Sequence, residues 1–436
     1  MEELTSARKY CVQQLIPAVR NPEVGVDLEA IGEHVQNSGS VVQEIFDENQ
    51  GEDSIAALKA IVASLQAKEQ ELAQGMVDPT SDELGDLEAA ANKLWILDTN
   101  RLVAGAELVL NFQEDTRYGD DNAHEALFEY VDGHAMSKST FMAFYKLLDN
   151  YTAEAGVTEQ VTDEEKQEIF AFLDVAVKTP VMQYVMKYLN ASGKLPDDAQ
   201  DEYGFKGFLY RLWFYFYSKE ARFDSSGFEH VFAGDTRDGK VGGMHNWIQL
   251  LVQERKSELN YLGYITSRGV DGDEEPGSEY LMSISFDWKG ATKTVGSSFF
   301  GTSPEFEMAL YTLFFLCGGE RNPVKLADRY NIDVVCYTFA GRYIGTCYPH
   351  VSKGFNWDAI PFPFRPACSE TSFVSGLLPF ARCTAWRMMS SSQILSSYTT
   401  DKARWTKKPQ NKSRSKVVLR FVSPASVSCI LVEGAQ

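Results

Sequence analysis

The chain has 436 residues, of which 44% are hydrophobic and 12% aromatic, and this is enough apolar surface to build a packed core in two or three domains. The composition excludes a globally disordered, collagen-like or disulfide-scaffold protein. With 41 basic and 61 acidic residues the net charge is −20. Such a chain repels polyanions at long range, so binding of nucleic acid by bulk charge is excluded and any cationic site must be local.

The chain start, the cysteines and the apolar runs bear on where the protein resides. Met1–Lys9 carries acids and no apolar core, so no secretory signal is expected and we predict an intracellular protein, cytoplasmic or nuclear. The seven cysteines include no CxxC pair, which disfavours a disulfide framework and a zinc ribbon. The longest apolar runs, Phe208–Tyr217 and Leu310–Cys317, are interrupted or too short for the roughly 20 residues that a bilayer requires, so we expect no transmembrane segment.

Residues 1–80 form an acidic region in which an amphipathic helix is predicted. Its apolar positions recur at steps of three and four residues and are Ile55, Leu58, Val62, Leu65 and Leu72. The stripe is too short for a coiled coil, which favours packing in a small helical bundle over a dimerisation helix or a helix that binds a protein partner. The segment Met76–Ser81 is expected to be a linker.

The first half of the following block, residues 82–351, is predicted to be helical. Thr162–Glu165 reads TDEE, a capping box, and starts a helix through Phe172. A second helix carries Val181, Tyr184 and Tyr188 on one face and ends near Gly193. These helices are expected to build core.

The second half of the block has the alternation of strands. Tyr280–Asp287 alternates between two faces and is followed by a turn at Gly290. Ile332–Phe339 and Tyr343–Tyr348 form a second hairpin candidate, and a helix between the hairpins begins at Ser303-Pro304-Glu305 and ends at Gly318-Gly319. Helices followed by antiparallel strands predict the α+β class.

Residues 352–436 differ in composition from the rest. They contain 12 Lys/Arg and 4 Asp/Glu, a net charge of +8, and 14 serines, whereas the preceding 351 residues hold 29 basic and 57 acidic residues. Without a sustained apolar period, this basic, Ser-rich tail is expected to be disordered apart from a short strand at 417–422.

Common catalytic motifs are missing from the sequence, and histidine is scarce. There is no Walker A loop, HExxH, GxSxG, or GxGxxG after a strand. Two of the six histidines, His230 and His245, lie in segments dense in Gly and aromatic residues. His245 falls where a glycine turn meets an amphipathic helix, so its ring is expected at a helix start, beside backbone N–H groups that suit a phosphate. Each histidine taken alone is more often structural than catalytic. A zinc site that adds Cys336 or Cys347 lacks the short paired spacings of metal sites.

Several long segments occur in the order found in one enzyme family, and they are Ala90–Trp95, Phe141–Tyr151, Asp224–Phe232, Gly243–Gln249, Lys293–Ser297 and Gly301–Tyr311. Over about residues 82–351 the chain thereby resembles the EndoU family of endoribonucleases. The resemblance implies a catalytic domain in which a helical layer precedes two β-rich lobes. It ends at Val351, so an alternative exon or a retained intron is another explanation for the tail.

The family's catalytic trio of two histidines and a lysine falls on His230, His245 and Lys293. In RNA transphosphorylation a base removes the 2′-hydroxyl proton, that oxygen attacks the adjacent phosphorus, and an acid protonates the departing 5′-oxygen while a cation stabilises the extra charge. Histidine suits both proton transfers because its unperturbed pKa is about 6.5. Similarity to the coronaviral relatives implies that His245 is the base and His230 the acid.

The resemblance also implies residues for base selection and for metal binding. A serine four residues after the lysine matches Ser297, and a Thr-x-Tyr motif matches Thr346 and Tyr348; hydroxyl groups can bond uracil and a tyrosine face can stack on it. Members similar to the frog enzyme need manganese, and the matching acids are Glu229 and Asp235, the latter a Glu in most relatives. Oxygen ligands suit Mn²⁺. Carboxylates that only orient His230, and a cation that screens acidic protein from acidic RNA, remain alternatives.

The predicted function is that of a uridylate-specific endoribonuclease. The resemblance implies a monomer that cleaves single-stranded, U-containing RNA, not DNA, and leaves 2′,3′-cyclic phosphate ends. The alternative is a catalytically silent RNA- or lipid-associated interaction protein on the same scaffold. The intact trio favours the enzyme.

Overall fold

The computed structural model describes residues 1–21, 23–116, 120–266, 280–351, 418–423 and 426–431. They belong to two compact units, Met1–Ile360 and Pro361–Gln436. In the second unit, β11 (Val418–Ser423) pairs antiparallel with β12 (Ser426–Leu431). The strand predicted at 417–422 is therefore present, whereas the disorder predicted for the rest of the tail falls outside the described residues.

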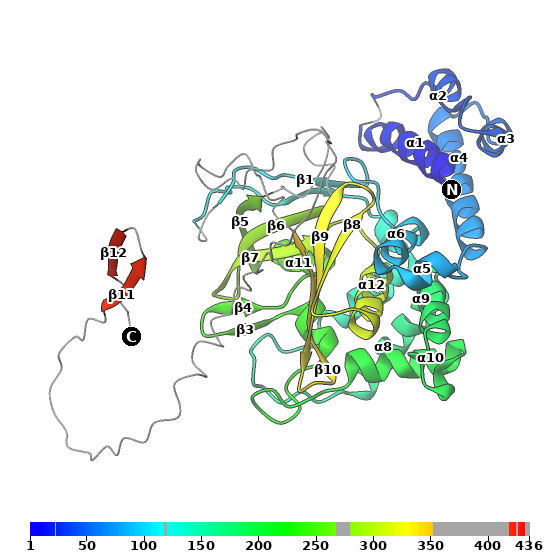
Figure 1. The fold of residues 1–436 in the computed structure, drawn as a ribbon. Helices are drawn as coiled ribbons and strands as arrows, with labels where there is room; N and C mark the ends of the chain where they lie inside the picture. The colour runs from blue at the N-terminus through cyan, green and yellow to red at the C-terminus, as the bar shows by residue number, and fades with distance from the viewer. Residues whose placement is uncertain (22, 117–119, 267–279, 352–417, 424–425, 432–436) are drawn as a thin grey trace, which may run out of the picture. The chain divides into compact units, whose positions relative to one another are not determined.

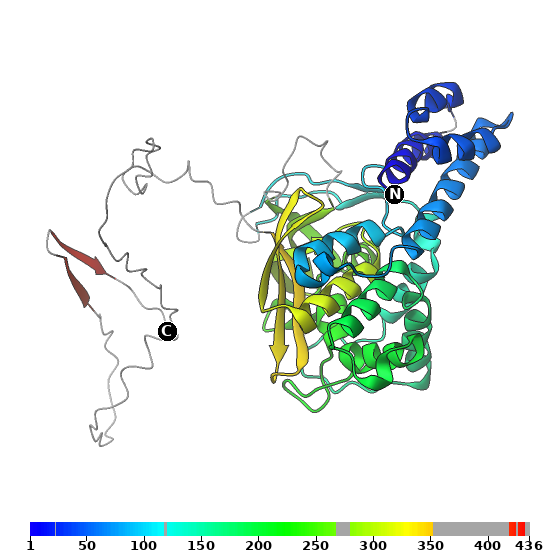
Figure 2. The same cartoon turned by 45° about the vertical axis from the view of Figure 1, so that its right-hand side comes forward.

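The N-terminal region of the first unit is a bundle of helices, drawn in blue in Figures 1 and 2. They are α1 (Glu2–Arg20), α2 (Leu28–Val35), α3 (Ser40–Glu48) and α4 (Ser54–Gln74). Leu58 and Leu65 of α4 are fully buried in one apolar cluster with Leu15 of α1 and Phe46 of α3. The predicted stripe on α4 therefore packs inside this bundle, which confirms the bundle interpretation.

Two further contacts tie the bundle together and to its neighbours. Arg8 of α1 and Glu69 of α4 form a buried ion pair of 2.6 Å, and α1 packs on the segment around Val103 through an apolar cluster of its own. In the segment predicted as a linker, Val77 is buried, so this connection is packed against the core. It leads to α5 (Ser81–Gly85), which begins with a capping box.

A helical layer follows the bundle. It comprises α6 (Leu87–Leu97), α7 (Ser139–Leu147), α8 (Asp163–Ala176), α9 (Pro180–Ala191) and α10 (Glu202–Leu209), with short η1 (Ala135–Ser137), η2 (Asp197–Ala199) and the π-helical turn η3 (Tyr210–Phe214). The Thr162–Glu165 capping box and the helix that ends before Gly193 are both confirmed. No single helix in the described ranges is long and apolar enough to span a membrane, although α8 and α9, bent by 85° at their junction, meet the criteria when taken together.

Two larger sheets form the β-rich part of the molecule. A five-stranded sheet has the order β3-β4-β7-β6-β5 and a three-stranded sheet the order β10-β9-β8. Their bounds are β3 (Asp235–Arg237), β4 (Lys240–Gly242), β5 (Leu259–Thr266), β6 (Leu281–Trp288), β7 (Ala291–Phe299), β8 (Arg321–Leu326), β9 (Tyr330–Phe339) and β10 (Tyr343–Val351). A small pair, β1 (Leu108–Leu110) and β2 (Phe128–Val131), forms a separate two-stranded sheet. Both predicted hairpins are present, and the α+β class is confirmed.

Helix α12 (Pro304–Cys317) joins the layers. Ser303 caps it by accepting a hydrogen bond from the Phe306 amide, and it ends at Gly318, as predicted. It contacts α6, α7 and α9 as well as β9 and β10, and its residues Pro304–Phe314 are all buried. Because α12 lies between the helical layer and the three-stranded sheet, it fixes the position of that sheet beside the five-stranded one.

Candidate active site

His230 lies in the π-helical turn η4 (Glu229–Ala233), and its partner Asp235 begins β3. The His230 Nδ1 atom is 2.6 Å from Asp235 Oδ2, and both side chains are almost buried. Burial alone would raise the pKa of Asp235, but the hydrogen bond from His230 and the charges nearby hold this pKa below its usual value. An ionised Asp235 therefore orients the imidazole and leaves its Nε2 free for proton transfer.

A glycine loop holds the second histidine against the first. The amide of Met244 donates to the His230 carbonyl at 3.0 Å, and the amide of His245 donates to the Val231 carbonyl at 2.8 Å. The approach requires glycine, because a Cβ on Gly243, whose φ is +56°, would lie 1.5 Å from the His230 carbonyl oxygen. The two histidines are therefore brought together by backbone contacts.

His245 is buried, and its surroundings favour the neutral ring. Its Nδ1 lies 3.0 Å from the Ser297 carbonyl, and the ring stacks on Tyr348 with centroids 4.7 Å apart. Burial, followed by the nearby charge of Lys293, lowers the pKa of His245 well below its usual value. A neutral ring that donates Nδ1–H to a carbonyl presents the Nε2 lone pair, as a general base requires.

Lys293 on β7 supplies the cation. Its Nζ donates to the Gly243 carbonyl at 2.7 Å, which places the ammonium group on the loop between the two histidines. Burial lowers the pKa of Lys293 to about 8, opposed by the charge of Asp235. The side chain is therefore mostly cationic at neutral pH and has a reduced hydration shell, which suits it to stabilise a developing phosphorane charge.

The residues predicted to select the base come from both sheets. Ser297 on β7 is buried, and its hydroxyl lies 2.7 Å from that of Ser283 on β6. Tyr348 lies on β10, and Thr346, two residues earlier, is paired with Tyr337 of β9. Ser297 and Tyr348 both contact His245, the first through its carbonyl and the second through its ring. One face of Tyr348 is thereby covered by His245, so a bound base can stack only on the opposite face.

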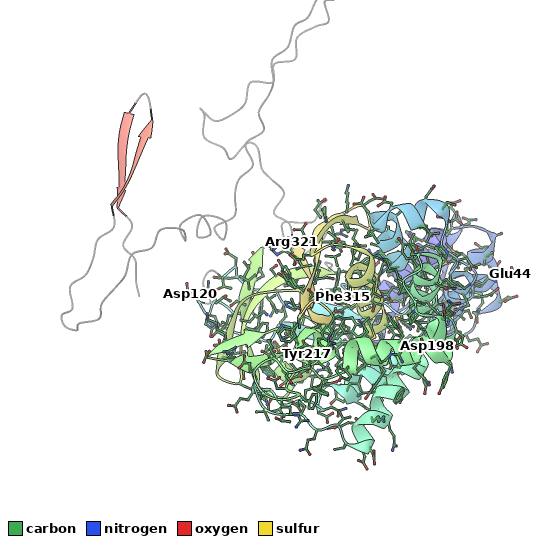
Figure 3. The ribbon with its side chains drawn as sticks, turned by 60° about the horizontal axis from the view of Figure 1, so that its bottom comes forward. Glu44, Asp120, Asp198, Tyr217, Phe315 and Arg321 are labelled. Atoms are coloured by element: carbon green, nitrogen blue, oxygen red, sulfur yellow. The ribbon has the colours of Figure 1, made fainter. Side chains whose placement is uncertain are left out.

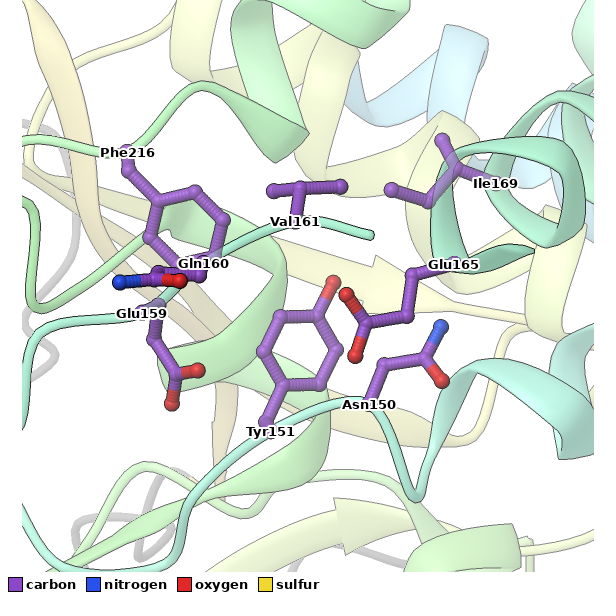
Figure 4. Close-up of a pocket in the computed structure, with 8 residues that line it drawn as sticks. All are labelled: Asn150, Tyr151, Glu159, Gln160, Val161, Glu165, Ile169 and Phe216. Atoms are coloured by element: carbon purple, nitrogen blue, oxygen red, sulfur yellow. The ribbon is translucent and has the colours of Figure 1, made fainter. Parts of the chain in front are cut away.

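Glu229 holds the histidine turn in place. Its carboxylate accepts from the Ser226 amide at 3.1 Å, and its own amide donates to the Ser226 hydroxyl at 3.1 Å. Burial, followed by the charges of Glu159 and Asp235, raises the pKa of Glu229 to about 8. Glu159 lines a small pocket where the Tyr151 hydroxyl is directed toward Glu165, as Figure 4 shows.

The surroundings of Glu229 and Asp235 favour a positioning role over metal ligation. No set of three or more His, Cys, Asp or Glu side chains in the part of the chain that the structure describes could hold an ion. Asp235 is engaged by His230, and Glu229 has a pKa of about 8. Among the described residues Cys336 and Cys347 also belong to no group of three or more potential metal ligands, so the zinc alternative has no support. The geometry therefore fits carboxyl groups that position His230 and its turn.

The prediction that backbone N–H groups beside His245 are open to a phosphate is wrong for the helix that follows this residue. Helix α11 (Trp247–Arg255) begins after Asn246, whose side-chain oxygen accepts from the amides of Ile248 and Gln249. These N–H groups are engaged by this cap, so they are not open to a ligand. Asn246 also donates to Glu307 of α12 at 3.1 Å. The sequence reasoning missed this residue, although an Asn directly before an apolar helical run is a recognisable capping signal.

Comparison with known proteins agrees with this geometry. The family model described as Endoribonuclease XendoU matches residues 86–349. The chain belongs to this family. It is 40% identical over 282 residues to "Uridylate-specific endoribonuclease B" of Danio rerio, covering 62% of this chain and 98% of the relative. It is 39% identical over 287 residues to "Poly(U)-specific endoribonuclease-B" of Xenopus laevis, covering 63% and 96%.

A solved structure of the XendoU family supports the fold. It is titled "The structure of XendoU: a splicing independent snoRNA processing endoribonuclease", and it matches with a TM-score of 0.54 at 37% identity, covering 63% of this chain and 98% of that one. The resemblance to this family and the layered α+β architecture predicted from the sequence are thereby confirmed. The family model begins at residue 86, after the helical bundle of α1–α4.

Proposed function

We propose that this member of the XendoU endoribonuclease family cleaves single-stranded RNA at uridylates by transphosphorylation. The relatives named above are uridylate- or poly(U)-specific endoribonucleases, which supports the choice of base. The observation that carries the reaction type is the arrangement of two imidazoles with different partners around one ammonium group. The reaction needs one group of each kind, a base, an acid and a cation.

The reaction assigns one role to each residue. Neutral His245 takes the proton from the 2′-hydroxyl, and the resulting oxygen attacks the adjacent phosphorus to form the 2′,3′-cyclic phosphate. The bond from phosphorus to the 5′-oxygen breaks, and protonated His230, held by Asp235, supplies the proton to this leaving oxygen. Lys293 stabilises the charge on the non-bridging oxygens. No water is consumed in this step, so the reaction is that of a lyase.

The test is end-mapped cleavage of an oligonucleotide that contains a single uridine. We expect one cut after the uridine, a 2′,3′-cyclic phosphate on one product and a 5′-hydroxyl on the other, identified by mass spectrometry. The same oligonucleotide with 2′-deoxyuridine is expected to stay intact, because the nucleophile is missing. Products with a 5′-phosphate, or cleavage of the deoxy substrate, would contradict the mechanism.

Substitution of the three reacting residues tests their roles. His230→Ala, His245→Ala and Lys293→Ala should each lower kcat by at least about 10², since each removes a proton-transfer or charge-stabilising group. Circular dichroism and thermal unfolding establish that each variant is folded. A folded variant with near wild-type cleavage removes that residue from the mechanism. A folded wild-type protein without cleavage would favour the silent interaction protein.

We also propose that Mn²⁺ stimulates cleavage, on the basis of the family resemblance. If Glu229 only holds the histidine turn, Glu229→Gln lowers the maximal rate and leaves the Mn²⁺ concentration for half-maximal stimulation unchanged. A shift of this midpoint by about 10-fold or more would identify Glu229 as a ligand.

A further inference from the structure

Aromatic rings and an arginine gather at the end of β10 that lies away from Tyr348. The β9–β10 turn brings Arg342 over Tyr343, with the guanidinium carbon 4.4 Å from the ring centroid. Tyr215 lies parallel to Tyr343, with an interplanar angle of 4° and centroids 5.9 Å apart, and it is 48% exposed. Tyr215, Arg342 and Tyr343 are called the hairpin-tip cluster below.

Tyr217 fixes the position of this cluster. It is buried, and its ring stacks on Tyr343 at 5.0 Å and on Phe339 at 4.8 Å. Its hydroxyl donates to the Ile344 carbonyl at 3.0 Å. Figure 3 labels Tyr217 among the side chains of this unit and Glu44 at the edge of the view. Because Tyr217 already packs the hairpin end, the exposed ring of Tyr215 is not needed to cover core.

A second pair of arginine and aromatic ring lies on a neighbouring turn. The guanidinium of Arg222 is 5.1 Å from the ring centroid of Phe223, which is 40% exposed. This turn ends at Ser225, whose amide and carbonyl both bond to the backbone of Tyr217. The turn of Arg222 and the hairpin end are therefore anchored on the same residue. Arg222 and Arg342 are both exposed, and each lies over an aromatic ring in a unit whose sequence is strongly acidic.

We propose that the hairpin-tip cluster binds single-stranded RNA that flanks the cleaved uridylate. The inference rests on the proposed function. Tyr343 belongs to the same strand as Thr346 and Tyr348, and five residues of β-strand span about 17 Å, so along this strand the cluster lies about 17 Å from Tyr348. The exposed ring of Tyr215 can stack on a base of any sequence, and arginine binds phosphate oxygens. A flanking strand matches both this chemistry and this position.

The test compares a short substrate with longer ones. The kcat/KM for cleavage is measured for three substrates. One is a trinucleotide with a central uridine, and the other two are this trinucleotide extended with adenosines to twelve residues, on the 5′ side in one and on the 3′ side in the other. For the wild-type protein, extension on one side should raise kcat/KM. Tyr215→Ala and Tyr343→Ala should each reduce kcat/KM for that longer substrate by about 5- to 150-fold, the range of a base–aromatic stack, and leave the trinucleotide unchanged. Tyr343→Phe should retain the wild-type values, because it keeps the ring.

Matched controls and a salt series complete the test. Tyr203→Ala removes a ring that is 82% exposed on α10, and Arg255→Ala removes an exposed arginine at the end of α11; neither should change the length dependence. Arg342→Ala should reduce the slope of log(kcat/KM) against log salt by about 0.7 on the longer substrate, as expected for one lost phosphate contact to a single strand.

The outcomes separate this inference from the proposed function. Equal losses on the short and long substrates would show that the cluster acts only through the hairpin, and unchanged values on both would show that it binds no RNA; either result overturns the inference. A wild-type protein that cleaves neither the trinucleotide nor the longer RNA would instead contradict the proposed function.

Discussion

His230 and His245 carry the same side chain in opposite surroundings. The imidazole of His245 is buried beside the Lys293 ammonium and donates to a backbone carbonyl, whereas His230 is paired with the carboxylate of Asp235. A buried neutral ring is suited to accept a proton, and the hydrogen bond to Asp235 fixes the orientation of the His230 ring. The surroundings thus support the assignment of base and acid that similarity to the coronaviral relatives implied.

The pH dependence of cleavage should reflect these surroundings. His245 must be neutral to act as a base, so kcat/KM should fall as the pH drops through its lowered pKa, at a pH below about 6.5. His230 must be protonated and Lys293 must be charged, so activity should also fall as the pH rises, and the Lys293 part of this fall should lie near its pKa of about 8. We therefore expect a profile with its maximum between these limits, measured with the single-uridine oligonucleotide at constant ionic strength.

The Lys293→Arg variant tests whether Lys293 causes the fall in activity at high pH, the alkaline limb of the profile. Arginine stays charged far above pH 8, so this variant should lose the fall in activity near pH 8, at a lower overall rate because the guanidinium has a different shape. If the alkaline limb stays in place in Lys293→Arg, it belongs to another group.

Base choice should depend on Ser297 and much less on Tyr348. Loss of one hydrogen bond to a base edge is typically worth about 0.5–1.5 kcal/mol, so Ser297→Ala should reduce the preference for U over C by roughly 2- to 10-fold. Ser298→Ala, a neighbouring buried serine, is the matched control. Tyr348→Ala should weaken cleavage at both bases, because it removes a stacking surface and the ring that packs on His245. The measurement uses two oligonucleotides that differ only in U or C, and a ratio that collapses in Tyr348→Ala but not in Ser297→Ala would reverse these roles.

Among the elements, the glycine loop before α11 has the strictest steric requirement. Gly243→Ala would drive a Cβ into the His230 carbonyl oxygen, 1.5 Å away, whereas Gly239→Ala meets nothing within 4 Å. Both residues have positive φ, so each substitution adds backbone strain of about 1 kcal/mol. We expect Gly239→Ala to lose only about this much stability in urea unfolding and to keep kcat.

Gly243→Ala should behave differently, because it must separate the two histidines. We expect a loss of kcat of at least about 10², together with a larger loss of stability than in Gly239→Ala. Gly242→Ala adds a second measurement, since its Cβ would lie 2.3 Å from Asp235 Oδ1, a side-chain atom that can move at lower cost. Wild-type kcat in folded Gly243→Ala would show that the loop does not position the histidines.

Elements with strong local signals were predictable from the sequence. The capping box at Thr162, the cap and proline at Ser303-Pro304 and the alternation in Tyr280–Asp287 all correspond to the observed elements. The alternation gave no sign that Leu281–Phe286 are buried on both faces of the strand. The π-helical turn that carries His230 was also missed, because such turns are set by tertiary contacts and have no local pattern.

At the scale of the whole molecule, sequence patterns did not predict which residues far apart in the chain lie side by side. The contacts of His245 with Ser297 and Tyr348 join a loop, β7 and β10, and only the family resemblance placed these residues in one site. The same holds for the bundle of α1–α4. Helix α4 was predicted from its apolar stripe. The buried Arg8–Glu69 ion pair that joins α1 to α4 was not predicted, because in the sequence both residues resemble ordinary surface charges.

The basic tail provides the last prediction. Strand β10 ends at Val351, where this residue pairs with Ile332, and the compact unit that contains the trio ends at Ile360. A protein truncated after Val351 should therefore fold and keep kcat within about 3-fold. The removed residues carry a net charge of +8, so any phosphate contacts that they make would be lost and KM for a long RNA should rise at low salt. Each lost contact reduces the salt dependence of log(kcat/KM) by about 0.7, and at high salt the truncated and full-length proteins should converge. If the truncated protein does not fold, residues beyond Val351 contribute to the catalytic unit, and the boundary lies further along the chain.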